Sequence, residues 1–117
     1  MLGSDDNREN AMPTITKDPN IQTVITTFEV TPGTCDDLLE ELRTACNDFV
    51  SKQPGFIGAA MHVNDAQTRI ANYTQWESRD HFLRTLRSEK MRAYSRKFND
   101  LCKTFEPVMY EVVTVSD

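Results

Sequence analysis

Four segments of the chain show hydrophobic patterns typical of β-strands, either an alternation of hydrophobic and polar positions or a short continuous apolar run. The four segments are Ile21–Val30, Phe56–Val63, Thr68–Trp76 and Val108–Val115. Only the polar residues Asn64–Gln67 separate the second from the third, so we expect these two to form an antiparallel hairpin. The last segment is almost continuously apolar, which indicates a strand that is covered on both faces.

The stretches between the strands show apolar residues at steps of three and four, which predicts amphipathic helices. The first helix is expected to begin after Thr34, whose hydroxyl is suited to an N-cap, and to run to about Val50. Two further helical segments are predicted after the hairpin, with Ser78 and Ser88 as their N-caps. Pro107 is expected to close the last of them.

The order strand, helix, strand, strand, helix, strand predicts the ferredoxin-like βαββαβ fold of the α+β class. In this fold a four-stranded antiparallel sheet carries its helices on one face. We expect this domain to span residues 21–117. Residues 1–20 are polar and contain two prolines, so we expect them to form a flexible N-terminal arm.

Apolar residues at the odd-numbered positions of the hairpin would lie on the sheet face that no helix covers. They are Ile57, Ala59, Met61, Val63, Ala71 and Tyr73. An uncovered apolar sheet face of this size is rare in a monomer. We therefore predict a homodimer that packs sheet against sheet and forms a dimeric α+β barrel.

The even-numbered face of the hairpin is predicted to form a small-molecule site. If Asn64 pairs with Thr68 at the turn, the even-numbered side chains of both strands share one face. That face holds Phe56, Gly58, Ala60, His62, Ile70, Asn72, Thr74 and Trp76. The glycine and the alanine leave space, and an imidazole, an amide, a hydroxyl and an indole N–H converge around it, as in a ligand pocket. A register shift of one residue would place His62 and Asn72 on opposite faces.

Each polar side chain of this face also has a purely structural interpretation. A buried Asn72 is explained equally well by hydrogen bonds to a loop. Trp76, at a strand end, is more often a core residue than a ligand contact. His62, next to the turn, is more often a solvent-exposed rim residue than a catalytic base.

Composition narrows the classes of function. The net charge of −5 argues against nucleic-acid binding, which normally requires a basic face. The three cysteines have no C-x-x-C spacing, which fits reduced thiols in a cytoplasmic protein better than a disulfide framework. The two histidines form no cluster with other ligands, so we expect no metal site. We expect neither a signal peptide nor a membrane-spanning segment.

Three short motifs resemble those of the antibiotic biosynthesis monooxygenase domain. They are Gln53-Pro54-Gly55-Phe56, then Ala60-x-His62, then Thr68-Arg69-x-x-Asn72-Tyr73-x-Gln75-Trp76-Glu77-Ser78. The similarity covers about Ile21–Val115 and is most specific from Asn72 to Ser78. Within the family the chain is most similar to the quinone-forming monooxygenases of aromatic polyketide pathways. The resemblance implies a dimeric ferredoxin-like barrel that oxidises phenols or anthrones with O2 and needs no flavin, haem or metal.

The resemblance also implies roles for individual residues. The catalytic positions of those enzymes match Asn72, Trp76 and His62. We expect the substrate contacts to come from Phe56, Thr74, Phe82, Leu86 and Arg96, with Phe98 as a further apolar wall. A pocket tyrosine of those enzymes falls at Phe82, so its hydroxyl is missing here. Their helix arginine corresponds either to Arg96 or to Arg92.

Two alternative functions stay open at this point. Other branches of the superfamily degrade haem, but they use an asparagine on the first strand, and Ile21–Val30 contains none. The second alternative is a non-catalytic dimeric protein that binds a small molecule or serves as an accessory subunit, because one fold hosts many activities.

Overall fold

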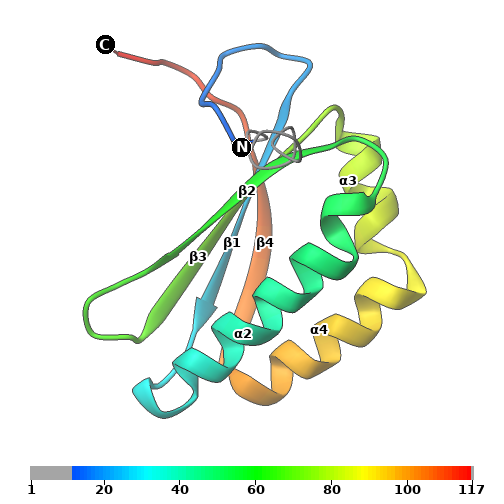
Figure 1. Ribbon diagram of the computed structural model, residues 1–117. Helices are drawn as coiled ribbons and strands as arrows, with labels where there is room; N and C mark the ends of the chain where they lie inside the picture. Colours follow the sequence, from blue (N-terminus) through cyan, green and yellow to red (C-terminus); the bar gives the residue numbers. More distant parts are fainter. Residues whose placement is uncertain (1–11, 117) are drawn as a thin grey trace, which may run out of the picture.

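The computed structural model describes residues 12–116, which form four strands and three α-helices (Figure 1). The elements are β1 (Gln22–Glu29), α2 (Pro32–Asp48), the single 3-10 turn η1 (Val50–Lys52), β2 (Phe56–Val63), β3 (Arg69–Trp76), α3 (Arg79–Leu86), α4 (Glu89–Leu101) and β4 (Thr104–Tyr110). None of the helices within the described range is long and apolar enough to cross a membrane.

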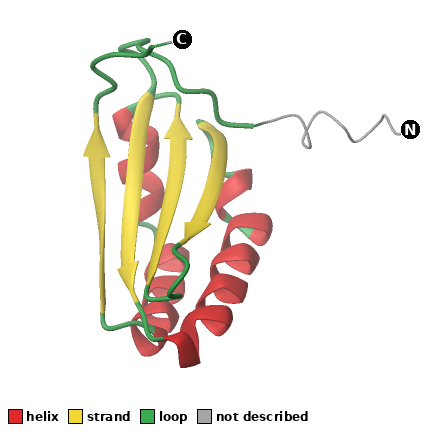
Figure 2. Cartoon of the chain, turned by 90° about the vertical axis from the view of Figure 1, so that its left-hand side faces the viewer, coloured by secondary structure: helices red, strands yellow, loops and turns green. Residues whose placement is uncertain are grey.

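The four strands form one sheet in the order β2-β3-β1-β4, and every neighbouring pair is antiparallel. All three helices lie behind this sheet, so one of its faces has no helical cover (Figure 2). This arrangement confirms the predicted ferredoxin-like α+β fold.

The register of the β2–β3 hairpin differs from the prediction by one residue. The N–H of Asn64 donates to the carbonyl of Arg69 at 3.2 Å, and Val63 pairs with Ile70. The cause lies in the turn, where Gln67 adopts a positive φ of 57° and adds one residue to the connection. Odd-numbered residues of β2 therefore face even-numbered residues of β3, and His62 pairs with Ala71 rather than with Ile70.

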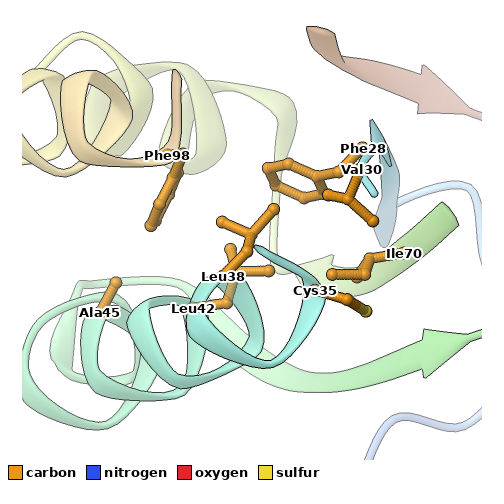
Figure 3. Packing of buried hydrophobic residues seen from close by; sticks show 8 residues of the cluster. All are labelled: Phe28, Val30, Cys35, Leu38, Leu42, Ala45, Ile70 and Phe98. Atoms are coloured by element: carbon orange, nitrogen blue, oxygen red, sulfur yellow. The ribbon is translucent and has the colours of Figure 1, made fainter. Parts of the chain in front are cut away.

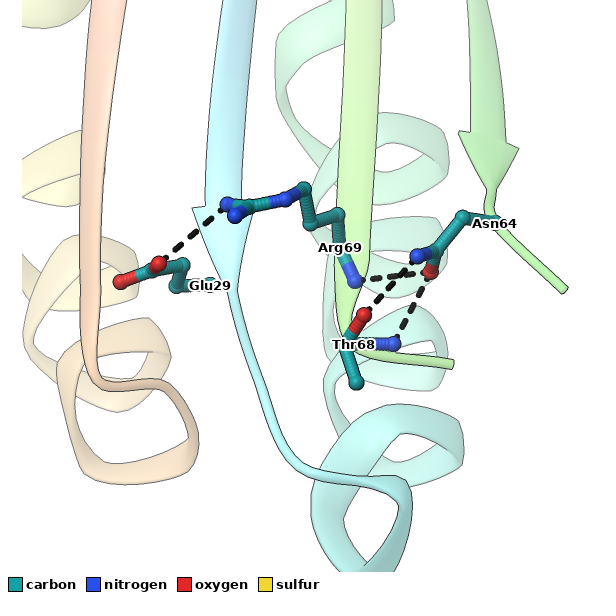
Figure 4. Close-up of polar contacts among 4 residues, drawn as sticks. All are labelled: Glu29, Asn64, Thr68 and Arg69. Carbon is teal, nitrogen blue, oxygen red and sulfur yellow. Dashed lines mark hydrogen bonds and ion pairs between the residues drawn. The ribbon is translucent and has the colours of Figure 1, made fainter. Parts of the chain in front are cut away.

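The side chain of Asn64 holds this turn in place (Figure 4). Its Oδ1 atom accepts the backbone N–H groups of Thr68 and Arg69, both at 2.9 Å. Its Nδ2 atom donates to the hydroxyl of Thr68 at 2.8 Å. Arg69 also forms an ion pair with Glu29 across β1 and β3 at 3.2 Å. The turn is thus fixed by local bonds that alternation of apolar residues does not reveal.

An irregularity between Phe56 and Gly58 reverses the register shift at the other end of β2. Phe56 is thereby paired with Trp76, as predicted, and the two rings meet edge to face with centroids 5.5 Å apart. Between the hairpin turn and this irregularity, the side chains of β2 lie on the face opposite to the predicted one. Met61 packs against the core beneath the helices, so its predicted place on the uncovered face is wrong.

The face without helices, here called the open face, is formed by alternate residues of all four strands. These include Ile25, Gly58, Ala60, His62, Ala71, Tyr73, Gln75 and Val108. Most are small or apolar and only partly buried. The open face therefore exists as predicted, but β2 contributes its even-numbered residues to it.

Part of the predicted N-terminal arm, residues 12–20, lies within the described range and contacts the open face. The buried side chain of Gln75 accepts the N–H of Thr14 at 3.0 Å and donates to the carbonyl of the same residue at 2.6 Å. This pair of bonds mimics a strand ladder and explains why a polar amide is buried on the open face. Residues 1–11 of the predicted arm lie outside the described residues.

Two predicted element boundaries are wrong for reasons of proline chemistry. α2 begins at Pro32, with Thr31 at the N-cap position in place of Thr34, because a proline suits the first turn of a helix. Pro107 does not close α4, which ends at Leu101, but lies inside β4. β4 is an edge strand, where a residue without an N–H is tolerated.

The core lies between the sheet and the helices and consists of two separate clusters. The larger one packs α2 and α4 against β1 and β3, as Figure 3 shows. It consists of Phe28, Val30, Cys35, Leu38, Leu42, Ala45, Ile70 and Phe98. The smaller one joins Val24, Trp76 and Phe82 at the other end of the sheet. The space between the two clusters is the subject of the next subsection.

Candidate active site

A pocket opens between the helix-covered face of the sheet and the three helices. It is lined by Thr26, Phe28, Leu42, Ala45, Cys46, Val50, Asn72, Thr74, Trp76, Phe82, Thr85, Leu86, Met91, Ser95, Phe98, Phe105 and Pro107. About 80 Å³ inside it can be reached by the centres of water molecules, and the empty space of the pocket and its mouth, open solvent included, is about 670 Å³. The interior therefore has room for several water molecules and is more than a packing defect.

The pocket exists because short side chains meet where long ones would fill the core. Thr26 on β1, Ala45 on α2 and Ser95 on α4 all contribute short side chains to the lining. Gly58 and Ala60, which were predicted to create the space, lie on the open face instead. The predicted hollow is thus present, but residues of the helices and of β1 produce it.

Asn72 is the most unusual residue of the pocket. Its Oδ1 atom is buried and has no hydrogen-bond partner among the described residues. Such an orphaned oxygen costs about 1–3 kcal/mol when no partner is present. The structural interpretation, in which Asn72 bonds to a loop, finds no support in the hydrogen bonds of residues 12–116. The oxygen is instead available to a donor on a bound ligand.

Trp76 is both a core residue and a wall of the pocket. Its side chain is buried, and its ring lies 5.9 Å from that of Phe82 and 5.5 Å from that of Phe56. Its indole N–H donates to the hydroxyl of Thr74 at 3.1 Å. The structure thus shows Trp76 as a core residue, and its place in the pocket lining leaves a contact with a ligand as a prediction.

Six of the nine predicted site residues line the pocket. They are Asn72, Thr74, Trp76, Phe82, Leu86 and Phe98. Phe56 lies outside the lining and supports Trp76 from the side. Neither Arg96 nor Arg92 is part of the lining, and both are exposed on α4. The Arg92 guanidinium donates to the backbone carbonyl of Arg87 at 3.0 Å.

The predicted position of His62 beside Asn72 is wrong. His62 is exposed on the open face, and its Nδ1–H donates to the carbonyl of Ala71 at 3.2 Å. The physical reason is the shifted register of the hairpin, which directs its imidazole away from the helices. The other histidine, His81, also lies outside the pocket lining, with its Nδ1 atom 2.7 Å from the hydroxyl oxygen of Ser78.

The structure adds polar residues to the site that sequence reasoning missed. Thr26, Thr85 and Ser95 all line the pocket. Two of them interrupt apolar helical stripes: Thr85 follows Phe82 by three positions, and Ser95 precedes Phe98 by three. A hydroxyl inside such a stripe is the signal that could have identified them, because stripes of this kind face the interior.

Among the described residues, the lining contains no carboxylate, imidazole, ammonium or guanidinium group. Its one titratable side chain is Cys46, and burial raises the pKa of this thiol. The pocket is therefore uncharged at neutral pH. The side chains of the lining can bind a flat neutral molecule through apolar walls and a few hydrogen bonds, but they supply no strong acid or base.

Comparison with known proteins places this fold and pocket in a family. The family model described as antibiotic biosynthesis monooxygenase matches residues 21–97, well over half of the chain. The chain belongs to the antibiotic biosynthesis monooxygenase family. The matched range includes β1, α2, the whole hairpin, α3 and most of α4, and thus nearly every wall of the pocket.

Within the antibiotic biosynthesis monooxygenase family, one curated relative is similar in sequence. Tetracenomycin-F1 monooxygenase from Streptomyces glaucescens is 31% identical over 71 residues, which is 61% of this chain and 63% of the relative. The chain thus matches somewhat less than two thirds of that protein's length.

Two solved structures from Streptomyces share the fold. A monooxygenase from the gene ActVA-Orf6 of Streptomyces coelicolor, solved in complex with nanaomycin D, has a TM-score of 0.71 at 24% identity. The match covers 85% of this chain and 94% of that one. SnoaB from Streptomyces nogalater, described as a cofactor-independent oxygenase, has a TM-score of 0.68 at 21% identity, with 82% and 96% covered. At these identities the likeness shows the fold alone.

Proposed function

We propose that this antibiotic biosynthesis monooxygenase oxidises a flat phenolic or anthrone-type aromatic molecule to a quinone with O2, without a cofactor. The observation that carries the proposal is the buried, unpartnered Oδ1 of Asn72 in a pocket with apolar walls. A phenol supplies both the donor for this oxygen and the flat apolar surface for Trp76 and Phe82. The family description supports a monooxygenase reaction, and one protein of the same fold is described as a cofactor-independent oxygenase.

The reaction balances with O2 as the only oxidant. Loss of one proton turns the methylene carbon of an anthrone into a carbanion, which passes one electron to O2. The resulting carbon radical and superoxide combine into a peroxide, which takes up a proton. Loss of water from the peroxide leaves a carbonyl group, so one oxygen atom enters the product and the other leaves as water.

The residues of the pocket can assist this chemistry without a catalytic base. The amide of Asn72 accepts a hydrogen bond from a phenolic hydroxyl and holds the ring in place. The walls exclude bulk water, which favours O2 and protects the carbanion. Because the described lining holds no base, the first proton passes to a water molecule at the mouth of the pocket, and the acidity of the substrate itself makes this step possible. The enzyme then acts chiefly by orientation and by hydrogen bonds to oxygen atoms that gain negative charge.

An oxygen electrode tests the proposal directly with the anthrone dithranol as the probe. We expect consumption of one O2 per quinone formed, incorporation of one atom of isotope-labelled O2, and no loss of rate after treatment with a metal chelator. Binding of dithranol without O2 uptake would contradict the proposal and favour the non-catalytic binding protein. A need for added flavin or metal would contradict the cofactor-independent mechanism.

We further propose that a second copy of the chain covers the open face. Its apolar side chains Ile25, Ala71 and Val108 are only half-buried in the single chain. No helix within residues 12–116 lies on that face (Figure 2). A sheet-to-sheet dimer would bury these side chains and remove their contact with water.

Sedimentation velocity tests this assembly. We expect the wild type to sediment as a dimer and Ile25→Glu to sediment as a monomer that keeps its circular dichroism spectrum. Lys97→Glu, a larger change of charge on the exposed surface of α4, is the control and should stay dimeric. A monomeric wild type at micromolar concentration would contradict the dimer.

A further inference from the structure

The indole N–H of Trp76 is already engaged in a hydrogen bond. It donates to the Oγ1 atom of Thr74 at 3.1 Å, and both side chains are more than nine-tenths buried. Tryptophan has one N–H and no other polar atom. While this bond holds, Trp76 has no donor left for an oxygen atom of a ligand.

Thr74, in contrast, has a hydrogen to give. Its hydroxyl accepts from Trp76 and carries one O–H donor of its own. No acceptor for that hydrogen is found among residues 12–116, and Thr74 is part of the pocket lining. A hydroxyl that accepts a hydrogen bond is polarised and becomes a better donor. The bond from Trp76 therefore strengthens the one polar hydrogen that Thr74 can offer to the pocket.

Thr74 and Asn72 alternate with Tyr73 on β3 and so share the helix-covered face of the sheet. At a rise of about 3.3 Å per residue, their side chains stand roughly 7 Å apart along the strand. Asn72 contributes an unpartnered acceptor and Thr74 an unused donor. This pair matches a flat molecule that carries a hydroxyl group at one place and a carbonyl or enolate oxygen at another.

We infer that Thr74 donates the hydrogen bond to the substrate oxygen that becomes negatively charged, and that Trp76 is a positioning residue that acts through Thr74. The inference rests on the proposed oxidation of a phenolic or anthrone-type substrate. It assigns the direct contact with the substrate oxygen to the hydroxyl of Thr74 on β3. Phe82, on α3, has no hydroxyl that could make this contact. Thr74 is then a catalytic residue, and Trp76 orients and polarises it.

The first test compares Thr74→Val with Thr74→Ser in O2 uptake with dithranol. Valine keeps the shape of threonine and removes the hydroxyl, whereas serine keeps the hydroxyl. Loss of one oxyanion donor typically costs about 100-fold or more in kcat, so we expect a fall of that size in Thr74→Val and a rate within about threefold of wild type in Thr74→Ser. Equal rates in the two variants would overturn the inference.

The second test separates direct action of Trp76 from action through Thr74. If Trp76 acts through Thr74, Trp76→Phe lowers kcat in the wild type but has almost no further effect in Thr74→Val. If the indole N–H of Trp76 instead bonds the substrate directly, the two losses multiply. The second result would overturn the positioning role.

A third test does not depend on turnover. Trp76 is the only tryptophan in the chain, so its indole N–H gives a single identifiable signal in proton–nitrogen correlation NMR and its fluorescence reports on the pocket. We expect the indole signal to move in Thr74→Val and to stay in Thr74→Ser. Fluorescence quenching measures the Kd of danthron, the quinone that corresponds to dithranol. We expect this Kd to rise in Thr74→Val and to stay near the wild-type value in Thr74→Ser.

The three tests distinguish the inference from the proposed function. If the wild type binds danthron but does not oxidise dithranol, the proposed reaction is wrong, and the Kd values still decide whether Thr74 contacts the ligand. If the wild type oxidises dithranol and Thr74→Val does so equally well, the reaction stands and the role of Thr74 is wrong. Absence of both binding and oxidation in the wild type would overturn the two together.

Discussion

The two faces of the sheet are built from alternate residues of the same strands, yet they differ in almost every property. The helix-covered face buries large apolar side chains and encloses an uncharged pocket with an unpartnered amide oxygen. The open face carries small, half-buried side chains, an exposed His62, and Gln75 bonded to the backbone of Thr14. The pocket and its unpartnered amide oxygen therefore lie on one face, and we propose that a second copy of the chain covers the other.

The comparison shows how much depends on a single turn residue. Gln67, with its positive φ, shifts β2 by one position relative to β3. This shift exchanges the faces of His62 and Met61 without changing the pattern of the fold. The difference between a site histidine and a surface histidine is thus decided at the hairpin turn and not in the strand.

The largest expected effect is on stability, where neighbouring residues of β1 test the contrast between the faces. Phe28 is 1% exposed, stacks on Phe105 and meets Phe98 edge to face, whereas Thr27 is exposed on the open face. We expect Phe28→Ala to lower the free energy of unfolding by about 3–5 kcal/mol, because it leaves a cavity in the core.

Urea denaturation of Phe28→Ala and Thr27→Ala measures this difference. Thr27→Ala should change the free energy of unfolding by less than about 1 kcal/mol. Phe28→Leu, which removes less volume, provides a measurable variant if the alanine variant does not fold. Equal losses at the two positions would contradict the assignment of faces along β1.

The second prediction concerns activity and sets Asn72 against His62. Asn72→Ala removes the pocket amide, and we expect kcat for an anthrone to fall by about 100-fold. His62→Ala removes an exposed side chain on the other face, and we expect a change of less than about twofold in kcat and KM. O2 uptake with purified variants measures both. A strong effect of His62→Ala would require the open face to take part in the reaction.

The third prediction tests the turn that fixes the faces. Gln67→Gly should raise the free energy of unfolding by about 0.5–1 kcal/mol, because glycine adopts a positive φ without strain. Asn64→Ala should lower it by about 1–2 kcal/mol, because the N–H groups of Thr68 and Arg69 lose their acceptor. Thermal unfolding measured by circular dichroism gives both values. A destabilising Gln67→Gly would contradict the left-handed turn.

The smallest expected effect is a pH dependence of stability from Cys46 in the wall of the pocket. Burial raises the pKa of this thiol, so the folded chain keeps the proton at pH values where the unfolded chain has lost it. Its contribution to stability is complete below the ordinary thiol pKa and is lost as pH rises above it. The free energy of unfolding between about pH 8 and pH 10 should therefore fall less steeply in Cys46→Ala than in the wild type. Parallel curves would contradict the burial of the thiol.

The sequence was informative wherever one residue type controls one local structure. Ser78 and Ser88 cap α3 and α4 by accepting the N–H groups of His81 and Met91, as their positions predicted. Apolar periodicity located the helices, and the order of the elements gave the ferredoxin-like fold. Prolines were the exception, because Pro107 is equally compatible with a helix end and with an edge strand, and only the sheet order decides between them.

The site residues on β3 could also be predicted. Asn72, Thr74 and Trp76 occupy alternate positions of one strand, so any register keeps them on one face. Residues on different strands depend on the register, which is why His62 and Gly58 were misplaced. Thr26, Thr85 and Ser95 were missed because they come from β1, α3 and α4, and only packing brings these elements to the same pocket.

By itself, then, the sequence determined the order and type of the elements, the family and the row of site residues along β3, because these depend on neighbours within a few positions. The tertiary structure decided which face β2 presents, where the pocket opens, and that the indole of Trp76 is engaged by Thr74. The reason is physical. Side chains alternate along a strand, so the spacing of residues fixes which of them share a face within that strand. The turn, in contrast, sets the register and so determines which residues of the next strand lie on the same face. One left-handed residue at Gln67 is enough to reverse that relation.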